Sequence, residues 1–133
     1  MKYLFIYLIA TAIFFGMDML WLGLIAKNFY RQKLGFIFTG EVRWAAAVIF
    51  YLIYIGGILY FAIQPGLNGG GWQIALLNGA LFGLMCYATY DLTNMATIKQ
   101  WPLVVVAVDI IWGMVLTGTV SVATYLVAAK WIV

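Results

Sequence analysis

Residues 103–129, LVVVAVDIIWGMVLTGTVSVATYLVAA, form an apolar run with one charged side chain, Asp109. At about 1.5 Å per residue, a helix of this length exceeds the roughly 30 Å hydrocarbon core of a bilayer. Three similar runs lie at residues 3–26, 44–63 and 73–98. All of these runs are continuously apolar, which favours helices over the alternating strands of a membrane barrel. The sequence therefore predicts an all-α integral membrane bundle of four transmembrane helices in a single domain, residues 1–133.

The composition of the chain also indicates a membrane protein and restricts its chemistry. Hydrophobic residues make up 67% of the sequence and charged residues 8%, whereas soluble domains carry about 25% charged residues. Histidine is absent and Cys86 is the single cysteine, which excludes an internal disulfide and a metal site built from His or Cys ligands. We expect no metal and no cofactor. The net charge of +3 does not indicate nucleic-acid binding, because the basic residues lie where a cytoplasmic lipid leaflet attracts them.

The distribution of Lys and Arg predicts the orientation of the helices. Loop one, residues 27–43, and loop three, residues 99–102, together carry five basic residues, whereas the two termini and loop two, residues 64–72, carry two. We therefore expect loops one and three in the cytoplasm and both termini outside, while an inverted or dual topology stays open. A Pro-Gly pair and three successive glycines predict a tight turn in loop two.

Loop one is patterned like a short amphipathic helix. Its apolar residues recur at spacings of three and four between the basic ones, which is typical of a helix that lies in the membrane interface. The basic side chains would there contact anionic lipid head groups. A second interpretation, that the loop only enforces the topology, stays open. The apolar residues are Phe29, Tyr30, Leu34, Ile37 and Phe38, and the candidate head-group contacts are Lys27, Arg31, Lys33 and Arg43.

Three of the four acidic residues, Asp18, Asp91 and Asp109, lie inside the predicted spans. An ionised aspartate near the centre of a helix costs roughly 2.5–3.5 kcal/mol to insert, and intramembrane acids mark functional sites by default. Each of these aspartates lies about 12–13 Å from the predicted cytoplasmic end of its helix, at about 1.5 Å per residue. We therefore expect the three carboxyl groups to share one layer in the cytoplasmic half of the membrane.

Four-residue steps place the acids on helix faces that meet inside the bundle. Gly79 and Gly83 precede Asp91 on one such face, and this glycine pair is a packing motif of membrane helices. Because no Lys or Arg lies within a span, the carboxyl groups would share a proton, accept hydrogen bonds, receive a basic residue from the interface or bind a cationic ligand. The expected buried polar cluster consists of Asp18, Trp21, Tyr87, Asp91, Asn94 and Asp109, and no catalytic residue is assigned.

The first and last spans share a short pattern around their acids. Asp18-Met-Leu-Trp21 and Asp109-Ile-Ile-Trp112 both read Asp, two apolar residues, Trp. An inverted repeat would produce such a pattern, but four residues are a short match, and chance is the simpler explanation. In the first span the face that carries the acid is expected to hold Thr11, Phe14, Asp18, Trp21 and Ile25.

Several segments carry a resemblance to a known family. These segments are residues 17–23 (MDMLWLG), residues 29–35 (FYRQKLG), residues 87–97 (YATYDLTNMAT), and Trp101-Pro102 followed by Asp109. On them the chain resembles the bacterial membrane family catalogued as domain of unknown function 2177. The resemblance implies a four-helix protein of the bacterial cytoplasmic (inner) membrane, and it implies no particular activity.

Three functions are compatible with this pattern. The favoured one is a small transporter or lipid-binding protein whose buried acidic site binds a proton, cation, amine or lipid head group. Transport by four short helices would need a homodimer. The second is a structural or accessory subunit whose buried acids only fix helix packing. The third is a membrane enzyme that acts on lipid, and it is disfavoured because no nucleophile motif and no phosphate-binding loop is present. The expected partners are membrane lipids and a small cationic or lipid ligand.

Overall fold

The computed structural model describes residues 1–37 and 42–133, and the chain is all-α, as predicted. Within these ranges five α-helices follow one another, and π-helical turns extend two of them and join α3 to α4. The α-helices are α1 (Lys2–Leu20), α2 (Lys27–Leu34), α3 (Trp44–Ile58), α4 (Gly71–Thr97) and α5 (Leu103–Trp131). The π-helical turns are η1 (Trp21–Ile25), η2 (Leu59–Ile63) and η3 (Gly66–Gly70).

In the described part of the chain, three helical runs are long and apolar enough to cross a membrane. They are Lys2–Ile25, Trp44–Thr97 and Leu103–Trp131. The sequence pattern predicted four spans, and the difference lies in the second run, which has 54 residues. This run joins two of the predicted spans, because η2 and η3 continue the helical winding through most of loop two.

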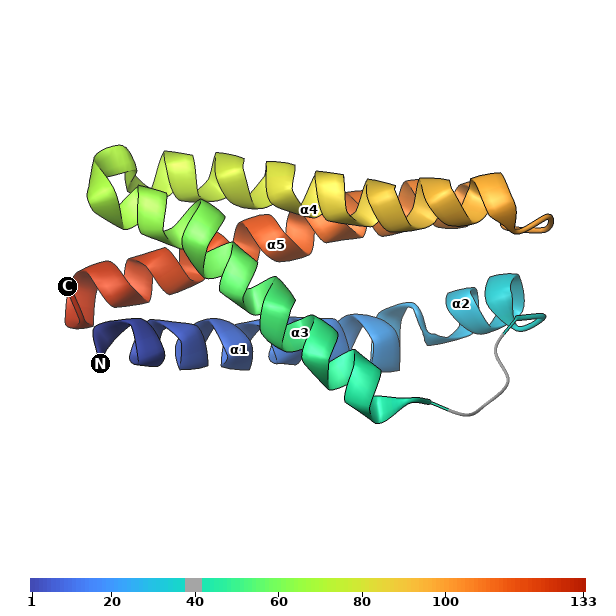
Figure 1. Ribbon diagram of the computed structural model, residues 1–133, viewed down its shortest axis with the longest axis horizontal. Coiled ribbons are helices and arrows are strands. Elements are labelled where there is room, and N and C mark those ends of the chain that lie inside the picture. The colour runs from blue at the N-terminus through green and yellow to red at the C-terminus, as the bar shows by residue number, and fades with distance from the viewer. Residues whose placement is uncertain (38–41) are drawn as a thin grey trace.

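The glycines of loop two reverse the direction of this long run. Helical geometry is lost at Asn68 and Gly69. Gly69 has a φ of 117° and Gly71 a φ of 78°, which is the left-handed conformation that glycine adopts without steric cost. The tight turn predicted from the sequence is therefore present, and α3 and α4 leave it as two separate arms (Figure 1).

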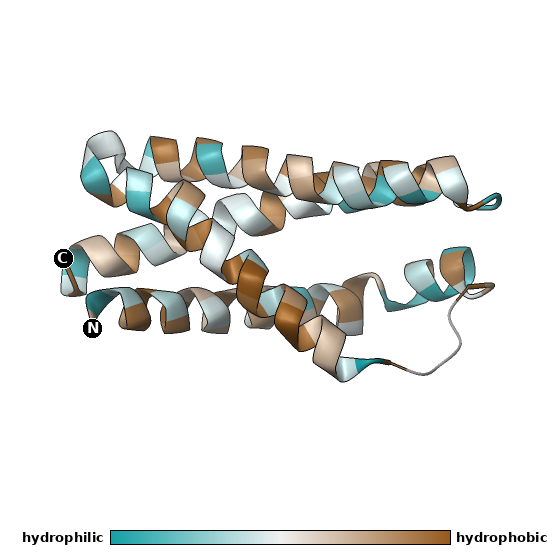
Figure 2. Cartoon of the chain, viewed as in Figure 1, coloured by the Kyte–Doolittle hydropathy of each residue, from teal (hydrophilic) through white to brown (hydrophobic). Residues whose placement is uncertain are grey.

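The helices form an elongated bundle with two distinct ends (Figure 1). α4 and α5 pack along each other, α1 packs against α5, and α3 runs obliquely from the turn at η3 across α1. Both chain termini lie at the end that carries this turn, and α2 lies at the opposite end beside the connection between α4 and α5. Figure 2 shows hydrophobic residues concentrated along the middle of α3 and hydrophilic ones at the turn and on α2.

The contact between α4 and α5 is close because glycine occupies the crossing positions. A Cβ atom on Gly79 would lie 2.8 Å from the carbonyl oxygen of Thr117, and one on Gly83 would lie 2.7 Å from the carbonyl carbon of Gly113. Atoms do not approach so closely without displacement, so a side chain at either position would push the helices apart. The predicted packing motif is confirmed. The buried residues of α4 are Ala75, Gly79, Gly83 and Asp91.

Loop one contains the predicted short helix, and the apolar face of this helix contacts the protein. Leu34 of α2 is buried in a cluster with Trp101, Val105 and Val106, at the start of α5. Phe29, Tyr30 and Ile37 pack against the same cluster, whereas Phe38 lies outside the described residues. These contacts attach α2 to the end of the bundle. An interfacial position for its basic face stays a prediction.

The first span departs from the predicted face at its end. Phe14 and Asp18 are buried, but Ile25, which the four-residue spacing placed with them, is 71% exposed. The reason is η1, where the helix widens to a π-helical turn. Such a turn holds more residues than an α-helical one, so it rotates the following side chains away from the original face.

We expect Gly83→Ala to lower the stability of the fold by about 1–3 kcal/mol, because the added methyl group overpacks the contact between α4 and α5. Thermal unfolding in detergent, followed by circular dichroism, measures the change. The matched control is Gly16→Ala on α1, where a Cβ atom meets no other atom within 4 Å. Equal melting temperatures for the two variants would show that the helix contact is not tight.

Candidate functional site

The three aspartates come from three different helices and are all buried. Asp18 on α1 is 5% exposed, Asp91 on α4 is 0% exposed, and Asp109 on α5 is 8% exposed. Among the described residues, the side chains that act electrostatically on Asp18 and Asp91 include no Lys or Arg. Hydrogen bonds or bound species must therefore stabilise these carboxyl groups.

Asp18 is held by two aromatic side chains from neighbouring helices. The Tyr51 hydroxyl on α3 donates to Oδ2 of Asp18 at 3.5 Å, and the Trp112 indole on α5 donates to Oδ1 at 3.4 Å. Both distances lie beyond the usual range for a strong hydrogen bond. Asp18 thus connects α1, α3 and α5. Because both of its hydrogen bonds are long, the carboxyl group could still accept a shorter hydrogen bond or pair with a positive charge.

Asp109 is bound through a phenol that α2 supplies. The Tyr30 hydroxyl donates to Oδ1 of Asp109, and the Trp21 indole donates to the Tyr30 oxygen at 3.1 Å. Burial, and secondarily the hydrogen bond to the Asp109 carboxylate, raises the pKa of Tyr30 above its ordinary value. The neutral phenol is therefore the stable form, and its hydrogen bonds connect α2 to η1 and α5.

The two Asp-x-x-Trp segments interlock at the centre of the site. The indole rings of Trp21 and Trp112 stack with their centroids 4.4 Å apart and their planes 10° from parallel. Each indole serves the acid of the other segment: Trp112 donates to Asp18, whereas Trp21 reaches Asp109 through Tyr30. An offset stack of this kind contributes about 0.5–1.5 kcal/mol beyond the burial of its area. The short sequence pattern thus corresponds to a real pair of contacts between α1 and α5.

Asp91 differs from the other two aspartates because it has no hydrogen-bond donor within the described residues. Both of its carboxylate oxygens are buried and unpartnered, and so is the indole nitrogen of Trp101. The side chains of Asp109 and Trp101 nevertheless lie close enough to interact with it electrostatically. A buried polar atom without a partner costs about 1–3 kcal/mol. The polar atoms of Asp91 and Trp101 therefore need a proton, an ion or a ligand as a partner.

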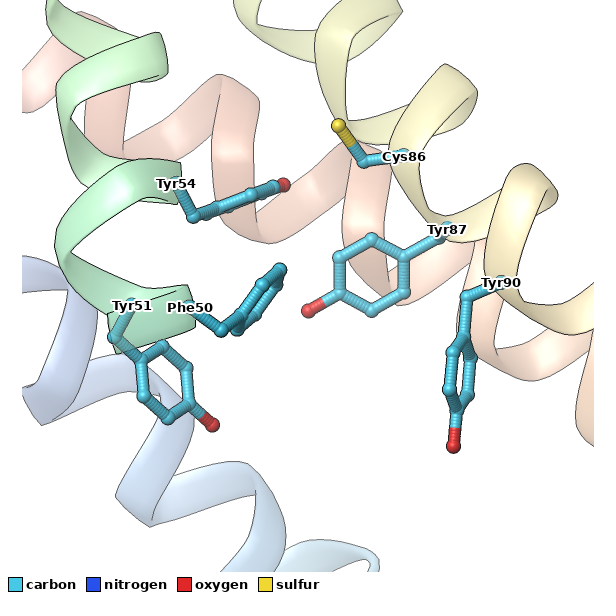
Figure 3. A pocket seen from close by; sticks show the side chains of 6 residues that line it. All are labelled: Phe50, Tyr51, Tyr54, Cys86, Tyr87 and Tyr90. Carbon is cyan, nitrogen blue, oxygen red and sulfur yellow. The ribbon is translucent and has the colours of Figure 1, made fainter. Parts of the chain in front are cut away.

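A cavity of about 380 Å³ opens between α3 and α4, and one of its lining residues, Tyr51, is the residue whose hydroxyl donates to Asp18. Its walls are almost entirely aromatic, and Figure 3 shows the Tyr87 hydroxyl directed across it toward α3. Tyr54 forms a buried part of the wall, and its hydroxyl is paired with the Thr117 hydroxyl at 2.6 Å. The lining residues are Phe50, Tyr51, Tyr54, Cys86, Tyr87 and Tyr90.

The structure divides the predicted polar cluster into separate groups. Asp18, Trp21 and Asp109 belong to the interlocked segments, and Asp91 interacts with Asp109. Tyr87 lines the cavity, and among the hydrogen bonds of the described residues none joins it or Asn94 to an aspartate. The site also contains residues that the sequence did not predict as members. These are Tyr30, Tyr51, Tyr54, Trp101 and Trp112.

The candidate head-group contacts lie on the outside of the molecule. Lys27, Arg31 and Lys33 on α2 and Arg43 before α3 are all exposed. Because the apolar residues of α2 turn toward the bundle, its basic residues are left on the outer face. Among the described residues, no three His, Cys, Asp or Glu side chains are grouped so that they could hold a metal ion.

The comparisons with known proteins identify the family of the chain. The model of the family DUF2177, described as a predicted membrane protein, matches residues 3–126. The chain belongs to the DUF2177 family. The resemblance seen in the sequence is thereby confirmed, and the match includes every aspartate of the site and every residue that lines the cavity. Searches with this DUF2177 protein against curated proteins and against solved structures gave no match.

We expect Tyr30→Phe to destabilise the protein by about 1–3 kcal/mol, because it removes the donor of Asp109 and the acceptor of Trp21. Thermal unfolding at neutral pH measures this loss, with the exposed Tyr60→Phe as the control.

The wild-type protein should lose stability as the pH rises past 10.0, the ordinary pKa of tyrosine, because the unfolded chain then ionises Tyr30 while the folded chain does not. Tyr30→Phe lacks this contribution, so the gap between the two proteins should narrow. A gap that is constant across this pH range would contradict the buried neutral phenol.

Proposed function

We propose that the protein is a multi-pass inner-membrane protein that binds an amine-bearing ligand, such as the head group of an aminolipid, in the cavity between α3 and α4. The observation that carries this proposal is an aromatic cavity whose lining residue Tyr51 hydrogen-bonds the buried Asp18. The cavity volume of about 380 Å³ falls within the roughly 300–1,000 Å³ that ligand pockets occupy.

The chemistry of the wall favours a cation. Tyrosine rings attract ammonium groups through their negative faces, by about 0.5–1 kcal/mol at exposed sites and about 2 kcal/mol where water is excluded. The Asp18 carboxyl group interacts electrostatically with Tyr51, Tyr54 and Tyr87, which are three of the wall residues. An ammonium group in the cavity would therefore gain several ring faces and the nearby negative charge, and Asp18 would gain the cationic partner that its own helices do not supply.

The position of the cavity supports a ligand that arrives from the lipid. Phe50 on α3 and Tyr90 on α4 are exposed at the rim, whereas Tyr54 is buried within. Both helices belong to the apolar run that could cross a membrane, so the rim would face the acyl chains. An amphiphile could place its head group in the cavity and leave its chains in the bilayer.

The same proposal includes the arrangement in the membrane. The two arms α3 and α4 each cross once, which makes four crossings with α1 and α5. The separation of the ends supports this arrangement, because both termini and the turn at η3 lie opposite α2 and the connection between α4 and α5 (Figure 1). The exposed basic residues of α2, together with Arg43 and Lys99, favour the cytoplasmic side for that end, where they would contact anionic head groups.

Single cysteines in a Cys86→Ala background test this topology. We expect Lys33→Cys and Lys99→Cys to react with a membrane-impermeant maleimide only after the cytoplasmic face is opened. Asn68→Cys and a cysteine at Val133 should react in intact cells. Labelling of Asn68→Cys from the same side as Lys99→Cys would contradict two separate crossings by α3 and α4, and full reversal of the pattern would contradict the orientation alone.

Native mass spectrometry of the purified protein tests the ligand. Wild type should retain phosphatidylethanolamine in preference to phosphatidylglycerol from a mixed micelle. Asp18→Asn should weaken this binding roughly tenfold, the equivalent of one charge-assisted contact, and Cys86→Phe should abolish it by filling the cavity. The control is Tyr60→Phe, which leaves the cavity unchanged.

The alternative function, in which the acids only fix helix packing, predicts a different result. Asp18→Asn would then lower the melting temperature while every variant kept the same lipid profile. Such a result would contradict ligand binding and establish the structural role that the hydrogen bonds of Asp18 to α3 and α5 support.

A further inference from the structure

A second polar site lies where α4, α5, α2 and the connection before α5 meet. It consists of Asp91, Asp109, Trp101 and Tyr30, and it is distinct from the aromatic cavity. Asp91 is fully buried, and Trp101 is 6% exposed. Both offer polar atoms without a partner among the described residues, namely the two carboxylate oxygens of Asp91 and the indole N–H of Trp101.

Tyr87 of α4 packs on Gly113 of α5, so the next turn of these antiparallel helices sets Asp91 opposite Asp109. Among the described residues, the side chains that act electrostatically on Asp91 are those of Asp109 and Trp101, and Asp91 in turn acts on the phenols of Tyr30 and Tyr90. The basic side chains at this end, Lys27, Arg31, Lys33, Arg43 and Lys99, are exposed to the outside. Two ionised carboxyl groups placed together in a medium of low dielectric constant repel each other strongly, and one proton between them removes that repulsion.

The donors and acceptors of the site accommodate one proton. Oδ1 of Asp109 already accepts a hydrogen bond from Tyr30, so Asp109 is an acceptor in this site. A protonated Asp91 has one O–H group to donate to Asp109 and one carbonyl oxygen to accept from the Trp101 indole. A single proton thus gives the two carboxyl groups a hydrogen bond to each other, and Asp91 keeps an oxygen that can accept from the Trp101 indole.

A metal ion fits the same site less well. Hard cations need six or more oxygen ligands, and among the described residues no three His, Cys, Asp or Glu side chains are grouped so that they could hold a metal ion. A proton needs only the two carboxyl groups, which favours it over a metal ion.

We propose that Asp91 and Asp109 form a proton-binding site in which one proton is shared between the two carboxyl groups, with Trp101 and Tyr30 as its hydrogen-bond donors. The site holds one negative charge and one proton at neutral pH. This inference is independent of the ligand proposed for the aromatic cavity, since neither of these two aspartates lines that cavity.

Infrared spectroscopy of the protein in lipid bilayers tests the proposal, because a protonated carboxyl group has a C=O band that an ionised one lacks. We expect wild type to show this band at neutral pH and to shift it on transfer to D₂O. Asp91→Asn should lose the whole band, and the matched control Asp18→Asn should keep it. Absence of the band in wild type, or its loss in Asp18→Asn and not in Asp91→Asn, would overturn the proposal.

A second variant keeps the test valid if Asp91→Asn does not fold. Trp101→Phe removes the indole N–H and retains an aromatic ring, so the carbonyl oxygen of Asp91 loses its hydrogen bond. The C=O band should then move to higher frequency without losing intensity. An unchanged band frequency in folded Trp101→Phe would show that Asp91 is not the protonated group that faces Trp101, and would overturn the assignment.

Discussion

The structure depends on one constraint: a carboxyl group inside an apolar bundle must obtain a hydrogen-bond donor, a counter-charge or a proton. Three aspartates are subject to it, and the only basic residues in the membrane-crossing runs of the described chain, Lys2 and Lys130, lie at the ends of those runs, far from the aspartates in the sequence. Asp18 and Asp109 obtain donors from aromatic side chains on other helices. These hydrogen bonds connect elements that lie far apart in the sequence, so the aspartates hold the α2 end of the bundle together. The glycine contact between α4 and α5 is needed for the same reason, because it brings Asp91 and Asp109 within range of each other.

The constraint also explains why α2 belongs to the protein core at this end. An amphipathic helix outside the spans would ordinarily bury its apolar face in the lipid interface. Here Tyr30 supplies the hydroxyl that Asp109 needs, and Leu34 packs into the cluster around Trp101. The π-helical turn η1 begins at Trp21 and ends just before α2. The turn exposes Ile25, and beyond it α2 packs against the start of α5.

Periodicity predicted the helices and the buried faces well, because both follow from hydrophobic spacing along a single element. The aspartates and the Gly79–Gly83 contact could be found in this way. The partners of the aspartates could not, since Tyr51, Tyr30 and Trp112 reach them through the relative rotation of different helices, which local sequence does not encode. The repeated Asp-x-x-Trp segment was the one sequence signal for these partners. Its meaning became clear only from the structure, in which the two Trp rings stack on each other. The sequence also counted two separate spans where the structure has one long run with a glycine reversal, because helical winding extends into a loop that composition alone marks as a turn.

The two stacked Trp residues connect the two polar sites. Trp112 bonds Asp18 beside the aromatic cavity, and Trp21 bonds Tyr30 beside the Asp91–Asp109 pair. Because the rings stack almost parallel at 4.4 Å, a shift of one indole displaces the other. A ligand that drew Asp18 away from Trp112 would release that indole and, through Trp21, weaken the support of Tyr30 for the Asp109 charge. If both proposals hold, occupancy of the cavity and protonation of the acid pair would be coupled through these packed aromatic rings. Thermodynamic reciprocity would then make each affect the other to the same extent.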